Sequence, residues 1–258
     1  MTEGFSTLEG WYTLHDFRTM DWPAWKALDP REKALVQEEL FSLLHRFCAI
    51  DEKREGSFGL FDVAGHKADF LFLNLRPTLE EITSLERDLN KTQFARYAKP
   101  AYSYVSVVEI SNYLHGQEKK PEDMLQDPYV QSRLYPVLPK VKAICFYPMN
   151  KKRDGQDNWY TLPVEERRAL MRDHGMTGRK FAGQLTQMIG GSIGLDDWEW
   201  GVTLFANDPV VFKKVVTDMR FDVVSARYAE FGAFFVGNAL DNDQLIKALD
   251  GTCHSTSK

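Results

Sequence analysis

Residues 68–111, ADFLFLNLRPTLEEITSLERDLNKTQFARYAKPAYSYVSVVEIS, and residues 200–240, WGVTLFANDPVVFKKVVTDMRFDVVSARYAEFGAFFVGNAL, share one order of features. In each stretch an apolar run leads to a proline, Pro77 or Pro209, and then to a helical pattern. Each then carries Ala-Arg-Tyr before an aromatic, β-rich run. The prolines lie 132 residues apart and the tripeptides 131 residues apart, so the match predicts an internal duplication.

Each half of the chain also has a strand and a helix upstream of the repeated stretch. In the first half, residues 10–17 are strand-like, and apolar residues at helical spacing indicate a helix from about Asp29 to Phe47. In the second half, residues 141–148 are strand-like, and helices are expected from about Pro163 to Ile189. The order strand–helix–strand–strand–helix–strand is that of the ferredoxin-like α+β unit. We therefore predict two ferredoxin-like repeats whose sheets lie side by side and form one dimeric α/β-barrel-like core.

The boundaries of the repeats follow from a polar stretch, HGQEKKPEDMLQDP, which shows no apolar periodicity. We expect an N-terminal repeat over residues 1–114 and a linker over 115–130. A C-terminal repeat over 131–240 and a tail over 241–258 complete the expected organisation.

The composition limits the classes of protein to consider. The chain has 258 residues, is 43% apolar and 27% charged, and has a net charge of −5, so a polyanionic partner such as bulk nucleic acid is disfavoured. The three cysteines have no short spacing, which fits a reducing cytoplasm and disfavours a zinc site. No signal peptide or apolar run of about 18 residues is evident. We expect a soluble cytoplasmic protein without a nucleic-acid or membrane partner.

His174 is the first candidate functional residue. If the whole segment to Ile189 is helical, His174 shares one face with Leu170 and Phe181 and points toward the sheet. A histidine in that position is either a hydrogen-bonded core residue or an axial ligand of haem iron. Gly175 and Gly178 would then let a flat macrocycle approach the helix backbone.

Tyr147 is the second candidate, in the stretch CFYPMNKKRDG at 145–155. It stands where an apolar run ends, beside the basic residues Lys151, Lys152 and Arg153. Such a basic run is either a solvated turn or a site that pairs with carboxylates of a ligand. Gln187, just before two glycines, is placed by its spacing alone at a solvated helix end.

Three longer strings carry a resemblance to a known family: RLYPVLPKVKAICFYPMNKKRDGQDNWYTLP, RDHGMTGRKFAGQLTQMIGGSIGLDDWEWGVTLF and MRFDVVSARYAEFGAFFVGN. They resemble the chlorite-dismutase-like haem proteins, and more closely the Firmicute branch of that family, the coproheme decarboxylases. The resemblance covers about residues 8 to 240 and is densest in the second half of the chain.

The resemblance implies a role for each matching residue. The histidine of RDHG, His174, would ligate iron on the proximal side, and the tyrosine and lysine of YPMxK, Tyr147 and Lys151, would be catalytic and contact the porphyrin. Further contacts to the porphyrin are implied within the YPMxK motif, at the arginine of RLYP, at the glutamine before MIGG and at the serine of SARY. These residues are Arg133, Pro148, Met149, Asn150, Gln187 and Ser225.

The implied reaction is the oxidative decarboxylation of iron-coproporphyrin III (coproheme) by hydrogen peroxide. Propionates 2 and 4 would become vinyl groups, giving haem b through a monovinyl intermediate in the last step of coproporphyrin-dependent haem biosynthesis. Coproheme would be both substrate and redox cofactor. The resemblance further implies a homopentamer and a coproporphyrin ferrochelatase as a donor of the substrate.

Two other functions stay open on the sequence. The first is a chlorite-degrading or peroxidase-like haem enzyme. Chlorite dismutases use a distal arginine, and the comparable position here resembles Gln187. Because glutamine carries no charge, chlorite chemistry is disfavoured. A non-catalytic haem carrier or sensor on the same fold would not require Tyr147, whereas a decarboxylase would.

Overall fold

The structure is a computed structural model, and it describes residues 7–111 and 124–250. The elements of the first repeat are β1 (Thr7–Met20), α1 (Trp22–Ala27), α2 (Pro30–Cys48), α3 (Ile50–Lys53), β2 (Ser57–Val63), β3 (Phe70–Arg76), α4 (Leu79–Lys91), η1 (Gln93–Arg96) and β4 (Ala98–Ser111). The strands and longer helices follow the expected order β–α–β–β–α–β.

The second repeat has the same order of main elements after a connecting helix, α6 (Pro128–Leu134). Its elements are β5 (Ala143–Lys151), β6 (Arg153–Asp154), β7 (Asp157–Asn158), η2 (Trp159–Thr161), α7 (Val164–Arg179), β8 (Thr186–Gly191), β9 (Trp200–Ala206), α8 (Val210–Met219), α9 (Val223–Tyr228), β10 (Ala229–Phe231) and β11 (Phe235–Ala239). A last helix, α10 (Asn242–Asp250), follows.

The strands close into a barrel. The first repeat pairs its strands in the order β2-β3-β1-β4, and the second in the order β8-β9-β5-β11. The fourth strand of each repeat then pairs with the second strand of the other, β4 with β8 and β11 with β2. Eight antiparallel strands therefore form a ring, and β10 adds to β5 outside it. The predicted α+β fold of two ferredoxin-like repeats is confirmed.

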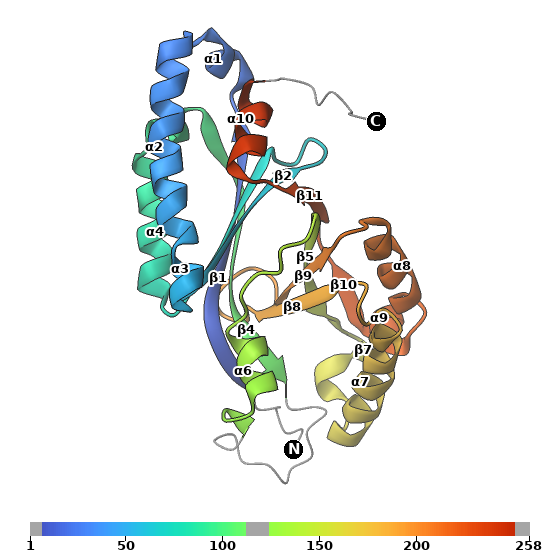
Figure 1. The fold of residues 1–258 in the computed structure, drawn as a ribbon. Coiled ribbons are helices and arrows are strands. Elements are labelled where there is room, and N and C mark those ends of the chain that lie inside the picture. The colour runs from blue at the N-terminus through green and yellow to red at the C-terminus, as the bar shows by residue number, and fades with distance from the viewer. Residues whose placement is uncertain (1–6, 112–123, 251–258) are drawn as a thin grey trace.

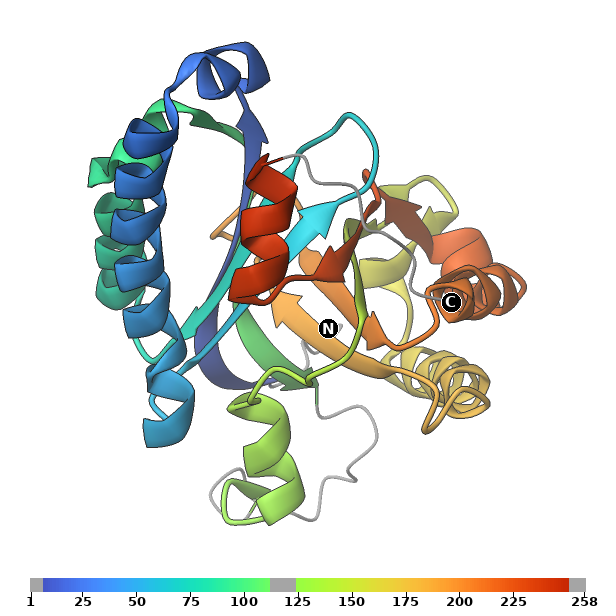
Figure 2. The same cartoon turned by 45° about the horizontal axis from the view of Figure 1, so that its top comes forward.

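The two helix layers lie on opposite sides of this barrel (Figures 1 and 2). On the first side, α2 and α4 each begin with a capping box, Asp29 with Glu32 and Thr78 with Glu81. On the second side are α7, α8 and α9. Aromatic rings such as Phe17 fill the barrel interior.

The helix expected from Pro163 to Ile189 is wrong in its second half. Helix α7 ends at Arg179, and a turn with Gly183 at φ +77° leads into strand β8. The apolar residues after this turn alternate with period two: Ile189 shares the outer face of the sheet, while Met188 points into the barrel. A short apolar run fits either period, and pairing with β9 decides for the strand.

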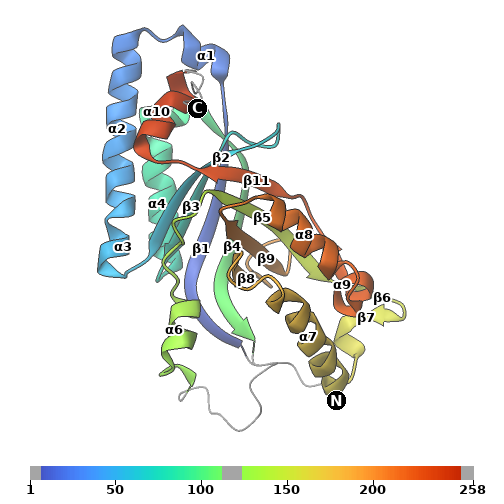
Figure 3. The same ribbon diagram turned by 45° about the vertical axis from the view of Figure 1, so that its right-hand side comes forward.

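The expected linker and tail both contain helices in the described residues. The end of the expected linker lies in α6, which packs over β1 and β4, while residues 112–123 lie outside the described residues. Helix α10 in the expected tail packs beside α2 (Figure 3), where Trp25 Nε1 donates a hydrogen bond of 2.9 Å to the carbonyl of Leu249. No helix in the described part of the chain has the length and apolar character to span a membrane.

His15 is a buried titratable group inside the barrel. Its Nε2 lies 2.9 Å from Thr203 Oγ1, its ring stacks on Phe146 at 4.1 Å, and its Nδ1 is buried without a hydrogen-bond partner among the described residues. Burial lowers the pKa of His15 to about 3, so the folded protein keeps this ring neutral where the unfolded chain protonates it.

We expect His15 to destabilise the fold in acid. At pH values between the ordinary histidine pKa of about 6.5 and the pKa in the folded protein, the unfolded state binds one more proton than the folded state. This residue therefore lowers the free energy of unfolding by about 1.4 kcal/mol for each pH unit by which the pH falls. Urea titrations at pH 7 and pH 5 should show that the free energy of unfolding decreases less for His15→Gln than for the parent protein. The glutamine amide can still reach Thr203. The exposed His45→Gln serves as the control, and parallel pH profiles for all three proteins would contradict the assignment.

Candidate functional site

Helix α7 buries little for a helix of its length. Of its 16 residues only Arg167 is buried, whereas α2 buries five apolar side chains against the first repeat. The half-exposed residues of α7 include Leu170 and His174. Its main packing partners are α8 and α9, and not the strands. The second repeat thus has a helix face that the chain itself leaves partly uncovered.

The sheet presents a matching face on the same side. Along β5, the side chains of Tyr147, Met149 and Lys151 point outward from the barrel, in alternation with interior residues. Tyr147 is opposite Val202 on β9, and Val202 is opposite Ile189 on β8. Gln187 lies two residues from Ile189 and therefore on the same outer face. The register brings Tyr147 and Gln187 onto one surface from strands 40 residues apart in sequence.

His174 is oriented by a carboxylate. Its Nδ1 lies 3.1 Å from Asp222 Oδ2, and Asp222 caps α9 by accepting hydrogen bonds from Ser225 N at 3.0 Å and Ser225 Oγ at 3.2 Å. Burial raises the pKa of Asp222, but the hydrogen bonds from His174 and Ser225 outweigh it and hold the pKa below the ordinary value. Because Nδ1 is engaged, Nε2 is the ring atom left to bind a metal.

Lys151 is buried rather than solvated. Its Nζ lies 4.6 Å above the ring of Trp159, and its backbone N–H donates to Glu199 Oε2 at 2.7 Å. Burial lowers the pKa of Lys151 to about 8, while the negative charges of Asp222 and Glu199 oppose that shift. The ammonium group therefore lies on the side of the site where Asp222 holds His174.

Tyr147 is enclosed by aromatic rings. Its ring stacks on Phe234 at 4.4 Å and is tilted against Phe231 at 5.8 Å, and its hydroxyl makes no hydrogen bond to the described residues. Burial raises the pKa of Tyr147, and the nearby Arg220 partly offsets the shift. The guanidinium carbon of Arg220 lies 3.9 Å from the centre of the Phe231 ring. Sequence analysis gave no role to Arg220, although it stands in the string MRFDVVSARY, because only the fold brings it to Tyr147.

The remaining candidates lie elsewhere. Pro148 and Asn150 alternate with the outward residues of β5, and Asn150 Oδ1 accepts the backbone N–H of Glu199 at 2.8 Å. Arg133 is half-buried in the last turn of α6, over the first repeat, and no described hydrogen bond or ion pair connects it to His174. The structure thus gathers six of the candidates on one side of the barrel: Tyr147, Met149, Lys151, His174, Gln187 and Ser225.

These residues fit an iron porphyrin. The partly uncovered face of α7 and the apolar residues of the sheet face would hold the macrocycle, and His174 Nε2 would be available to bind its iron. Gly178 does not open the helix backbone to the macrocycle, because it faces α8: a Cβ there would lie 3.1 Å from Met219 Cε. Its role is the close approach of α7 to α8.

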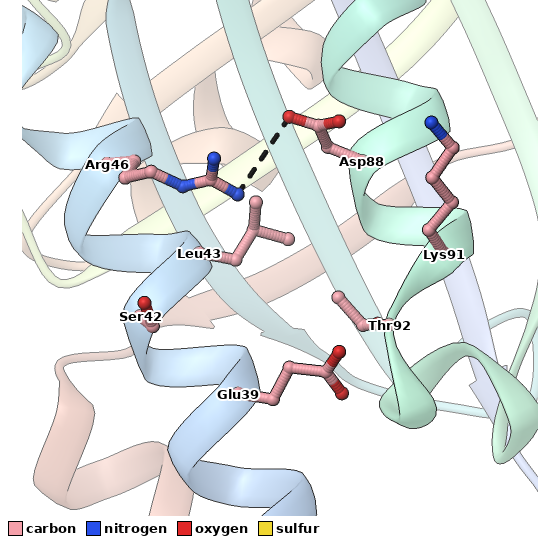
Figure 4. A pocket seen from close by; sticks show the side chains of 7 residues that line it. All are labelled: Glu39, Ser42, Leu43, Arg46, Asp88, Lys91 and Thr92. Atoms are coloured by element: carbon pink, nitrogen blue, oxygen red, sulfur yellow. Dashed lines mark ion pairs between the residues drawn. The ribbon is translucent and has the colours of Figure 1, made fainter.

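A separate pocket of about 310 Å³ lies between α2 and α4 in the first repeat (Figure 4). It is lined mainly by polar side chains, and Arg46 and Asp88 approach each other there at 3.9 Å. None of the candidate residues lines it. It is too polar for a porphyrin face, and its lining contains no His, Cys, Met or Tyr, the usual protein ligands of haem iron.

Comparison with known proteins identifies the family. The model of the chlorite dismutase family matches residues 34–240, which span most of both repeats. The chain belongs to the chlorite dismutase family. It is 50% identical to a novel heme-binding protein from Thermus thermophilus, with 97% of this chain and 99% of that chain covered and a TM-score of 0.92.

More distant members share the fold. A mutant chlorite dismutase from Candidatus Nitrospira defluvii in complex with cyanide is 17% identical, with 93% of this chain and 95% of that chain covered and a TM-score of 0.75. A second mutant of the same enzyme is 18% identical, with coverage of 94% and 95% and a TM-score of 0.75. A haem-binding site on the face described above agrees with this membership.

We expect His174→Ala to change the iron ligation of the haem-loaded protein. The Soret band should shift and haem should be lost faster on a desalting column, because alanine offers no donor atom. Met176→Ala, at an exposed position of the same helix, is the matched control. An unchanged ligand spectrum in His174→Ala would rule out this residue as the ligand.

Proposed function

We propose that this protein is a coproheme decarboxylase. The observation that carries the proposal is Tyr147, an oxidisable phenol that has no hydrogen-bond partner among the described residues. It lies on the outer face of the sheet, on the side of the barrel where Asp222 orients His174. A protein that only binds haem has no need of such a phenol beside its ligand.

Hydrogen peroxide is the oxidant of the proposed reaction and accepts the electrons that the propionates lose. Each reacting propionate loses carbon dioxide and one hydrogen from its β-carbon, and the two carbons that remain form a vinyl group. The bound iron porphyrin supplies the redox chemistry, through which two electrons pass to one peroxide and yield two water molecules. Two such rounds convert coproheme to haem b through a monovinyl intermediate.

Tyr147 acts as a hydrogen-atom relay in this proposal. Because burial raises its pKa further above the ordinary value of about 10, the phenol is neutral at pH 7 and is not a base. The phenol would lose one electron to the peroxide-oxidised porphyrin site, and its proton would go into the water formed from peroxide. The resulting tyrosyl radical would take a hydrogen atom from the propionate β-carbon. The phenol is thereby restored, and the second electron leaves the propionate as carbon dioxide is released.

Two cations orient the reacting carboxylates. Arg220 stands beside the aromatic cluster around Tyr147 and has the planar donor group that pairs with a carboxylate. Lys151, with a pKa of about 8, remains mostly protonated at pH 7 and supplies a second positive charge. A contact of Arg133, in the last turn of α6, with a propionate rests on the resemblance alone.

Further parts of the proposal rest on the resemblance alone. They are a cytoplasmic location, a homopentameric assembly, and a coproporphyrin ferrochelatase that donates coproheme. Haem binding without catalysis is the second candidate function, since the relative that is 50% identical is known as a heme-binding protein. Chlorite degradation is disfavoured because Gln187 cannot supply a positive charge.

The direct test is to titrate the purified protein with iron-coproporphyrin III and then with hydrogen peroxide. Mass spectrometry should show two successive losses from the porphyrin, each corresponding to carbon dioxide and two hydrogens. Recovery of the intact tetracarboxylate, or of oxidised fragments only, would leave non-catalytic haem binding as the better proposal.

Tyr147→Phe should bind coproheme but form little or no monovinyl product. The substitution removes only the hydroxyl, so the stacking on Phe234 and the fold should persist, but the phenyl ring has no O–H to oxidise. We expect the rate of decarboxylation to fall by at least about 100-fold, as for the loss of a positioned proton-transfer group. Tyr129→Phe, at an exposed position on α6, is the control. Near-normal decarboxylation by Tyr147→Phe would exclude the tyrosyl relay.

Gln187→Ala should slow the reaction without abolishing it. The amide can donate a hydrogen bond to peroxide or to a propionate, but it does not accept the proton of peroxide as a base would. The variant should show a lower rate or weaker coproheme binding while both mass losses persist, and the exposed Gln184→Ala should behave as the parent protein. A completely inactive Gln187→Ala that binds coproheme normally would make this residue essential and contradict the assignment.

A further inference from the structure

Trp200 is a second oxidisable ring on the face that carries Tyr147. It is the first residue of β9 and lies opposite Met149 on β5 and Gly191 on β8. Since Tyr147 is opposite Val202, Trp200 and Tyr147 are diagonal neighbours on adjacent strands. Diagonal pairs in antiparallel sheets have Cα atoms about 7–8 Å apart, which is within reach of large aromatic side chains.

Glu109 on β4 is the partner of this indole. Its Oε1 accepts a hydrogen bond of 2.8 Å from Trp200 Nε1. The carboxylate crosses β8 at Gly191, where a side-chain Cβ would collide with it. Glycine at this position therefore permits the contact between β4 and β9, which are otherwise separated by a strand.

The surroundings of Glu109 favour its protonation. Burial raises the pKa of Glu109, the hydrogen bond from Trp200 opposes the shift, and the charge of Glu9 adds to it. Glu9 is directly opposite Glu109 on β1 and is the charged group that faces it from that strand. From the other side, β8 contributes Gly191 and β9 contributes Trp200, neither of which titrates.

The two rings differ in how they can release a proton. The Tyr147 hydroxyl has no hydrogen-bond partner among the described residues, so its proton has no protein base to receive it there. The Trp200 N–H already points at a carboxylate oxygen at a distance suited to proton transfer. Removing an electron from an indole makes its N–H strongly acidic. The pair is thus built for coupled loss of an electron and a proton.

We propose that Trp200 and Glu109 form a second redox-active pair beside Tyr147. In the step, the indole gives one electron to the peroxide-oxidised porphyrin site and its Nε1 proton passes to Glu109 Oε1, leaving a neutral tryptophan radical and a carboxylic acid. Reverse transfer of both restores the pair. It takes up oxidising equivalents when no reactive propionate lies at Tyr147. The inference rests on the proposed function for its oxidant, hydrogen peroxide acting at a bound iron porphyrin.

The coupling between the two side chains is tested first without porphyrin. In the ¹⁵N-labelled apoprotein, the indole N–H resonance that disappears in Trp200→Phe should move with pH, with a midpoint above the ordinary glutamate value of about 4.3. Glu109→Gln should abolish that movement, whereas Glu9→Gln should only lower the midpoint. A Trp200 resonance unaffected by pH, or one that still titrates in Glu109→Gln, would overturn the pairing.

The redox role is tested in the protein loaded with haem b, the product, which has no propionate left to react at positions 2 and 4. Freeze-quench electron paramagnetic resonance after peroxide should show a tryptophan radical, identified by line narrowing with ring-deuterated tryptophan. Trp200→Phe should lack this signal, and the nearly isosteric Glu109→Gln should reduce its yield by about tenfold or more, because the proton acceptor is gone. A signal of unchanged size in either variant would overturn the proposal.

The outcome separates this inference from the proposed function. Decarboxylation of coproheme without any tryptophan radical in the haem b form would remove the pair and leave the decarboxylase intact. A Trp200 radical in a protein that never decarboxylates coproheme would support the pair and remove the decarboxylase.

Discussion

The site depends on the closure of the barrel by two equivalent strand pairings between the repeats. Strand β4 pairs with β8 and β11 pairs with β2, so each repeat is completed by the other. In a closed antiparallel sheet, side chains alternate strictly between the interior and the helix layers. A slip of one residue in the register of β5 would turn Tyr147 into the aromatic interior and expose Phe146. The placement of the catalytic candidates is therefore a property of the whole ring.

The duplication makes two equivalent sheet faces, but the sequence fills only one of them. The first repeat covers its face with α2, whose five buried side chains include Leu40 and Phe47. In the second repeat the corresponding helix, α7, buries only Arg167. A fully buried leucine contributes about 1.5–3 kcal/mol, so α7 lacks much of the stabilisation that α2 has. A bound macrocycle would supply the missing apolar contact, which explains why one helix of a symmetric pair is left half-exposed.

Two carboxylates hold functional candidates on the outer face of the second repeat. Asp222 links His174 to Ser225 near the buried Lys151, and Glu109 on β4 accepts a hydrogen bond from Trp200 on β9. Tyr147, on the same outer face of the sheet, stacks on Phe234, and its hydroxyl has no partner among the described residues. An oxidisable phenol with no protein base beside it suits the abstraction of a hydrogen atom from a bound substrate. The Asp222 carboxylate suits the positioning of His174, and the Glu109 carboxylate suits the uptake of a proton from Trp200.

The fold could be predicted from the sequence because the repeated order of features survives in both halves. His174 and Tyr147 were found through motifs, and the period-two rule places Tyr147 on the outer face once β5 is known. The end of α7 was not predictable, since the apolar residues from Phe181 to Ile189 fit both helical and strand periods. Contacts such as that of His174 with Asp222, 48 residues apart, and of Glu109 with Trp200, 91 residues apart, leave no local pattern. They exist only because the barrel closes.

The measurement that tests this account most directly is a crystal structure of the coproheme complex, with iron located by its anomalous scattering. The account predicts iron bonded to His174 Nε2, with a propionate beside the Tyr147 hydroxyl. Iron located on the α2–α4 side of the barrel, or bound by a residue other than His174, would contradict it.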